Sequence, residues 1–146
     1  MANQENIRPA EQLDLDRLDP WLKSNLDDLS GLPNVTQYSG GASNWTYRLE
    51  YPQRDLVLRR APSGTKAKGA HDMGREYRLQ KALKPVYPYV PEMLAHCDDE
   101  NVLGSEFYVM QRLDGCVTDL FKHGCSPGIA AYCRLLGQKN LPACKL

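Results

Sequence analysis

The sequence predicts an α+β fold, in which one antiparallel sheet of five strands carries a packed helix. Short apolar or alternating runs bounded by turn residues indicate strands, and two longer runs with apolar positions three or four apart indicate helices. Their order is helix, three strands, helix, two strands, which is typical of an antiparallel sheet. The 146 residues, of which 42% are hydrophobic, suit one domain with a buried core.

The first helix is expected to begin at Asp19, because an Asp before Pro20 combines an N-cap residue with a proline at the first helical position. Gly31 would then end it. The helix would carry one apolar stripe, made of Leu22, Leu26 and Leu29. We therefore assign residues 1–32 to an N-terminal helical segment.

Three strands are expected next, over residues 35–38, 45–51 and 56–60. In the second run, apolar and polar residues alternate as in a half-buried strand, with Trp45, Tyr47, Leu49 and Tyr51 on one side. Residues 52–55 have the composition of a turn, so the second and third strands should form an antiparallel hairpin.

The second helix should open at His71 or Asp72 and run to about Leu83 or Lys84, before Pro85. Its apolar side would be formed by Met73, Leu79 and Leu83. Two further strands are expected over residues 93–97 and 107–113. Residues 98–101 would form a turn near the first of these strands, and Gly104 would break the chain before the second.

A glycine-rich turn is the first candidate for chemistry. It consists of Gly40, Gly41, Ala42, Ser43 and Asn44. Backbone N–H groups in such a turn can point at phosphate oxygens. The turn lies between two strands rather than before a helix, which excludes the usual P-loop and the dinucleotide-binding pattern. Taken alone, such a turn is more often an ordinary hairpin turn.

Glu76 is the second candidate, because it shares a helix side with apolar residues and a carboxylate there needs a partner. Arg59 and Arg60, at the end of the third strand, are the nearest cations in the predicted topology. A cation held by Glu76 would point back at the glycine-rich turn and could meet phosphates. A plain structural salt bridge is the alternative.

The third candidate is the run over residues 107–115, an apolar strand that enters a polar turn. It could serve as the hinge to a second lobe, and its backbone could hydrogen-bond an adenine. An ordinary edge strand would have the same pattern.

Four segments together resemble a family: residues 40–47, 56–62, 70–77 and 107–110. Their order and spacing are similar to those of the aminoglycoside phosphotransferase family, which has a protein-kinase-like fold. The resemblance is nearest to the branch that includes kinase-like domains fused to acyl-CoA dehydrogenases. It covers about residues 10–115 and implies that residues 33–115 are a kinase-like N-lobe.

The resemblance also implies roles for the candidate residues. Gly40 to Asn44 would form the loop over the phosphates of ATP, which the complete enzyme would use as Mg-ATP. Arg59 would occupy the place of the family's phosphate-binding lysine, and Glu76 would be its helix partner. The hinge would be formed by Met110, Gln111, Arg112 and Leu113. Backbone atoms of Gln111 and Leu113 would face the adenine, and the γ-phosphate would go to a hydroxyl of a small-molecule acceptor.

Residues 116–146 are expected to form an irregular tail. The tail holds four of the five cysteines, without the C-x-x-C pair of a typical structural zinc site. The resemblance implies a His-Gly-Asp catalytic loop and a metal-binding Asp in a second lobe, but His123 and Gly124 precede Cys125 instead. We therefore expect a truncated or frameshifted second lobe and a chain inactive on its own. The alternative is a non-catalytic nucleotide- or protein-binding module that self-associates through an exposed lobe surface.

Composition narrows the possible partners. The net charge is +0, without the basic excess of a nucleic-acid binder. Residues 54–81 hold eight bases against three acids, which could meet phosphate or form a solvated face. No apolar stretch has the length of a membrane span, and the N-terminus is polar. We expect a cytoplasmic protein with reduced cysteines.

Overall fold

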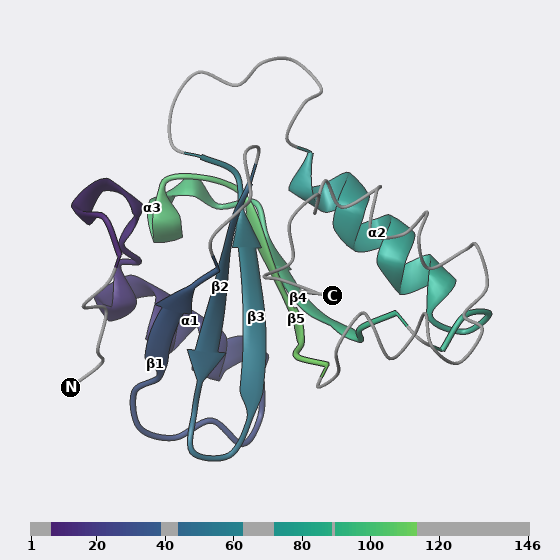
Figure 1. Cartoon of the computed structure of the whole chain (residues 1–146), viewed down its shortest axis with the longest axis horizontal. Helices are drawn as coiled ribbons and strands as arrows, with labels where there is room; N and C mark the ends of the chain where they lie inside the picture. Colours follow the sequence, from purple (N-terminus) through teal and green to yellow (C-terminus); the bar gives the residue numbers. More distant parts are fainter. Residues whose placement is uncertain (1–6, 39–43, 63–71, 89, 114–146) are drawn as a thin grey trace, which may run out of the picture.

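The computed structural model describes residues 7–38, 44–62, 72–88 and 90–113 (Figure 1). It contains one sheet of five antiparallel strands in the order β1-β2-β3-β5-β4. The strands are β1 (Asn34–Gln37), β2 (Trp45–Glu50), β3 (Asp55–Arg60), β4 (Met93–Cys97) and β5 (Phe107–Gln111). All five lie where the sequence predicts them, within a residue or two at their ends, so the α+β class and the five-stranded sheet are confirmed.

β3 is the central strand and connects the two halves of the sheet. It pairs with β2 on one side and with β5 on the other, so that Arg59 lies opposite both Thr46 and Tyr108. The side chains of β3 alternate between two hydrophobic cores: Leu56 and Leu58 belong to one core cluster, and Val57 belongs to another. Successive side chains of a strand point to opposite faces, so the sheet has a core on each side.

The larger core lies between the sheet and α1 (Leu15–Asn25), which passes behind the strands in Figure 1. Leu18 and Leu22 of α1 are fully buried. The strands contribute alternate residues to this core, which are Val35, Tyr47, Leu49, Leu56, Leu58, Ala95, Cys97, Phe107 and Val109. Burial of large aliphatic and aromatic side chains contributes about 1.5–3 kcal/mol each relative to exposure. We call this side of the sheet the α1 face.

The predicted start of the first helix is wrong. α1 begins one turn earlier, at Leu15, with the Asp14 carboxylate accepting the N–H of Arg17, and Pro20 lies inside the helix. Asp19 is buried and accepts hydrogen bonds from the Tyr51 hydroxyl at 2.7 Å and from a lysine one turn away. Both Asp14 and Asp19 are suitable N-cap residues by type. Asp14 takes the cap position because Asp19 is packed inside the helix, against the end of β2.

The end of the first helix also differs from the prediction. α1 stops at Asn25, because Leu26 has an extended backbone. Gly31 does adopt a left-handed backbone, with φ of 74°, but it lies six residues after the end of α1, in an irregular segment. Leu26 is buried and Leu29 is partly buried against the same core, so the predicted apolar residues pack as expected without being helical.

The smaller core lies between the sheet and α2 (Met73–Leu83), which runs beside β4 and β5 in Figure 1. We call this side the α2 face. The predicted start at Asp72 is confirmed, since its carboxylate accepts the N–H of Arg75 at 2.6 Å. The predicted apolar side is wrong in one position: Leu79 is 46% exposed, and Gln80 takes the buried place. Gln80 follows Met73 by seven residues, two helical turns, whereas Leu79 does not.

The expected turn after β4 is in part helical. α3 (Glu100–Leu103) is a single helical turn capped by the Asp99 side chain. Gly104 ends it with φ of 76°, in the left-handed conformation that glycine adopts without a Cβ penalty. A 3-10 turn, η1 (Pro9–Glu11), precedes α1. Within the described segments, no helix is long and apolar enough to cross a membrane.

Candidate functional site

Arg59 and Glu76 are brought together on the α2 face. Arg59 comes from the last part of β3 and Glu76 from the first turn of α2, and Arg59 Nε lies 3.7 Å from Glu76 Oε2. The Arg59 side chain is only 5% exposed, and that of Glu76 is 25% exposed. Arg60 points to the other face, where its guanidinium stacks over Trp45. The alternation of β3 therefore selects Arg59 as the partner of Glu76.

The Glu76 carboxylate has polar contacts at both of its oxygens. Oε2 accepts a hydrogen bond from the Tyr108 hydroxyl at 3.0 Å, and Oε1 accepts one from Asn44 Nδ2 at 3.4 Å. Gln80 Nε2 in turn donates to the Tyr108 oxygen at 3.2 Å. Burial raises the pKa of Tyr108, Arg59 opposes this shift and Glu76 adds to it, so the hydroxyl stays protonated as a donor. We call these five residues the Arg59 network.

Two members of this network were not among the predicted site residues. Tyr108 follows Phe107 in a strand whose residues are nearly all buried, so alternation alone could not assign its face. A signal for Gln80 did exist: it lies four residues after Glu76, on the same side of α2. Its polar character in a buried position indicates a polar neighbour, because a buried amide needs hydrogen-bond partners.

Glu106 connects the two elements that carry Arg59 and Glu76. Its carboxylate accepts the N–H of Gly74, two residues before Glu76, at 2.9 Å. Its backbone carbonyl accepts the N–H of Ala61, two residues after Arg59, at 3.3 Å. The same carboxylate lies 2.8 Å from His96 Nε2. Glu106 therefore ties the start of α2 to the end of β3 and sets how closely the helix approaches the sheet.

A buried apolar cluster extends from the Arg59 network toward the end of β5. Val57, Met93 and Met110 are buried neighbours there, and Val57 pairs with Met110 across the strands. Two further predicted hinge residues, Gln111 and Leu113, follow at and just after the end of β5 and are exposed. The apolar cluster and the cation thus lie at opposite ends of one sheet face, as a site for a flat base and a phosphate chain requires.

The backbone bonds of the hinge limit what it can offer to a base. The N–H of Gln111 donates to the carbonyl of Glu92 at 2.9 Å, and the N–H of Arg112 donates to the carbonyl of Asp55 at 3.4 Å. Of the two residues predicted to face adenine, Gln111 can therefore offer only its carbonyl oxygen. The N–H of Leu113 is the remaining candidate donor of the predicted hinge.

Most of the predicted phosphate-binding loop lies outside the described residues. This holds for Gly40, Gly41, Ala42 and Ser43. Asn44, the last residue of the loop, is buried and contacts Glu76. The end of the glycine-rich run thus lies beside the Arg59–Glu76 pair. The predicted tail, with its four cysteines and His123, also lies outside the described residues.

Comparison with protein families gives a match that covers most of the chain. The model described as the phosphotransferase enzyme family (APH) matches residues 34–138. The match includes the sheet, α2 and the Arg59 network, and it continues past residue 115, where the sequence alone was expected to leave the family pattern. The domain boundary expected near residue 115 stays a prediction.

Curated relatives have longer chains. Acyl-CoA dehydrogenase family member 11 from Rattus norvegicus is 34% identical over 128 residues, which make up 85% of this chain and 16% of that protein. Family member 10 from Mus musculus is 35% identical over 130 residues, 88% of this chain and 12% of that protein. The chain thus spans less than a fifth of the length of either relative.

A solved structure has the same fold. It is the crystal structure of a Ralstonia eutropha JMP134 protein described as an aminoglycoside phosphotransferase. The TM-score is 0.62 at 32% sequence identity, and the similarity covers 73% of this chain and 30% of the other. The kinase-like phosphotransferase fold expected from the resemblance is confirmed.

Proposed function

This chain belongs to the phosphotransferase enzyme family, and we propose that its described part binds ATP as the donor of a phosphate for a small-molecule hydroxyl. The observation that carries the proposal is the Arg59–Glu76 pair on the α2 face. A guanidinium presents its N–H groups in a planar fork that matches the oxygens of a phosphate, and Glu76 holds the Arg59 guanidinium on this face.

Each part of ATP has a proposed contact. The adenine would lie against Val57 and Met110, with its edge toward the Gln111 carbonyl and the Leu113 N–H. The phosphates would extend toward Arg59, under the backbone N–H groups of Gly40 to Ser43. Asn44 supports this direction, because its contact with Glu76 places the end of that loop next to the cation.

Glu76 would act by holding Arg59 rather than by touching the nucleotide. Tyr108 and Asn44 donate to its two oxygens, which keeps the carboxylate oriented in a partly buried place. The network thus stabilises the cation before a nucleotide arrives. We assign to the described residues the binding and orientation of the donor; the acceptor is proposed only as a hydroxyl-bearing small molecule.

Calorimetric titration with Mg-ATP and with adenosine would test the proposal. We expect the wild-type chain to bind both, and Arg59→Met to weaken ATP binding by about tenfold or more while adenosine binding changes little, since a charge-assisted contact to phosphate is lost. Arg75→Met, which removes an exposed arginine of α2, the helix that carries Glu76, is the matched control and should leave both affinities unchanged.

The proposal fails if the wild-type chain shows no binding of Mg-ATP up to millimolar concentrations. It also fails if Arg59→Met and Arg75→Met weaken ATP binding equally, because the effect would then reflect overall charge. Circular dichroism melts of both variants show whether Arg59→Met retains the fold, and Arg59→Lys, which keeps the charge, should restore part of the ATP affinity.

A further inference from the structure

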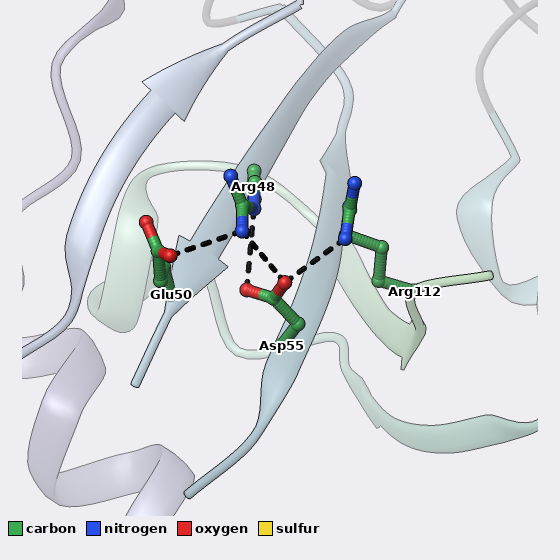
Figure 2. Close-up of polar contacts among 4 residues, drawn as sticks. All are labelled: Arg48, Glu50, Asp55 and Arg112. Carbon is green, nitrogen blue, oxygen red and sulfur yellow. Dashed lines mark hydrogen bonds and ion pairs between the residues drawn. The ribbon is translucent and has the colours of Figure 1, made fainter. Parts of the chain in front are cut away.

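A cluster of four charged side chains lies on the α2 face at the hinge end of the sheet (Figure 2). Asp55, the first residue of β3, is at its centre. Arg48 of β2 donates to both of its carboxylate oxygens, from Nε at 3.2 Å and from an Nη at 2.7 Å. Arg112, just after β5, donates to the same carboxylate at 3.0 Å, and Glu50 accepts a bond from Arg48 at 3.0 Å.

Asp55 holds residue 112 twice. Its carboxylate accepts from the Arg112 side chain, and its backbone carbonyl accepts from the Arg112 N–H. These two bonds fix both ends of a residue that is separated from Asp55 by 57 positions in the sequence. Arg112 lies between Gln111 and Leu113, so the orientation of the two peptide groups proposed to face adenine depends on it.

The geometry differs from that of an ordinary surface ion pair. Arg48, Asp55 and Arg112 have side chains that are each 28% exposed, and the Arg48–Asp55 contact is bidentate. Such contacts are stronger and more directional than single exposed pairs. Hydrogen bonds from Arg48 lower the pKa of the Asp55 carboxyl from its usual value, and Arg112 acts in the same direction.

The charges of the cluster argue against a phosphate site at this end of the sheet. Two arginines face two carboxylates, and each guanidinium already donates to Asp55. The cluster is therefore neutral and internally bonded, whereas an anion site would present donors that point outward. Its hydrogen bonds run across the strands, from β2 through β3 to the segment after β5 (Figure 2).

We propose that Asp55 is a positioning residue that fixes the hinge at Arg112 and so determines the affinity of the site for the adenine base. The inference rests on the proposed nucleotide-binding function. It assigns the two ends of the α2 face different tasks. Asp55 acts on the base through the hinge backbone, and Arg59 acts on the phosphates directly.

The test compares adenosine and Mg-ATP binding in the full chain by calorimetry. Asp55→Asn removes the charge and keeps the shape, and Arg112→Gln removes the side-chain bond from the opposite partner. We expect each variant to weaken adenosine binding about five- to tenfold and ATP binding by the same factor, because the base is common to both ligands. Arg59→Met should weaken only ATP binding.

Glu50→Gln is the matched control. Glu50 contacts Arg48 but lies on the side of the cluster away from Arg112 (Figure 2), so the variant should bind adenosine like the wild type. A second readout follows the backbone: amide hydrogen exchange at Arg112 should become faster in Asp55→Asn than in the wild type and stay unchanged in Glu50→Gln.

The outcomes separate the two proposals. A wild-type chain that binds neither ligand overturns the nucleotide function and this inference with it. A wild-type chain that binds both, with Asp55→Asn and Arg112→Gln binding adenosine equally well, overturns the inference alone. Equal losses in Glu50→Gln and Asp55→Asn also overturn it, since the effect would then come from local charge. If Asp55→Asn does not fold, Arg112→Gln decides the question.

Discussion

The two faces of the sheet hold their helices by different means. On the α1 face, Leu18 and Leu22 enter an extensive apolar core, and α1 is attached mainly by burial. On the α2 face, the helix contributes Met73 and the half-buried Tyr77 to a smaller core and is also held by polar contacts of Glu76, Gln80 and the Gly74 N–H. Apolar burial tolerates small shifts in position, whereas hydrogen bonds demand a particular distance and direction.

This difference suits a molecule in which the α1 face supplies stability and the α2 face carries the proposed ligand site. The α1 face should supply most of the free energy of unfolding, because it removes the larger apolar surface from water. The α2 face holds a cation beside a carboxylate at a defined separation, which is useful for binding an anion and less useful for stability. Substitutions on the two faces should therefore have different consequences.

The largest expected effect is that of Leu22→Ala on the α1 face. Leu22 is fully buried, so its truncation should lower the free energy of unfolding by about 3 kcal/mol through lost burial and a residual cavity. Leu79→Ala on α2 is the matched control, since Leu79 is 46% exposed and should lose less than about 0.5 kcal/mol. Urea denaturation of both variants measures the difference.

A large loss in Leu79→Ala would contradict this comparison. It would mean that Leu79 is covered in solution and that α2 packs by its leucines, as the sequence alone suggested. A small loss in Leu22→Ala would instead mean that the α1 core can collapse around the missing side chain. In either case the two faces would be more alike than their contacts indicate.

A medium effect is expected for Gly74→Ala on the α2 face. Alanine favours a helix over glycine by about 1 kcal/mol, but a Cβ at this position would lie 2.8 Å from Glu106 Oε1. That oxygen is held by the Gly74 N–H and by His96, so it cannot move without losing a bond. We expect Gly74→Ala to lower the free energy of unfolding by about 1 kcal/mol.

The double variant shows whether Glu106 is the cause. In a Glu106→Ala background, the added methyl no longer meets the carboxylate, and Gly74→Ala should become neutral or stabilising. A double-mutant cycle in urea measures this reversal as a coupling between the two positions. If Gly74→Ala stabilises the wild-type chain, Glu106 does not set the approach of α2, and the α2 face is less rigid than proposed.

The sheet was predictable from the sequence because alternation is a local property. Tyr47, Leu49 and Tyr51 alternate with polar residues, and their strand, its face and its hairpin partner followed from that pattern. The sequence left Arg59 and Arg60 as possible partners of Glu76. The alternation of β3 selects Arg59 once the core on each side of the sheet is known.

The parts that the sequence did not reveal depend on long-range contacts. Asp14 and Asp19 are equally good helix caps in isolation, and the Tyr51 hydroxyl, far away in the sequence, is one of the partners that hold Asp19 inside the helix. Leu79 was assigned to the core because it is apolar, although its helical position favoured Gln80. The bonds between Asp55 and Arg112 join residues far apart in the sequence, and no local pattern predicts them.

The smallest expected effect concerns the acid dependence of the Asp55 cluster. The pKa of Asp55 is lowered in the folded chain, so its contribution to stability is fully present above the unfolded-state pKa, about 3.9. It is lost as the pH falls through the lower folded-state pKa. At pH 7, Asp55→Asn should therefore be less stable than the wild type by about 0.5–1 kcal/mol, because the cluster is partly exposed and screened by solvent.

Below about pH 4 the two unfolding curves should converge, because the wild-type carboxyl becomes protonated and Asn then resembles it. Urea titrations of both chains between pH 7 and pH 3 measure this convergence, and Glu50→Gln, whose side chain is 48% exposed, should stay near the wild type throughout. Curves that remain parallel down to pH 3 would show that the loss in Asp55→Asn is independent of the charge. Convergence together with weaker adenosine binding would instead mean that charged residues matter at both ends of the α2 face. Their contribution to stability would be modest, and their contribution to positioning the ligand would be larger.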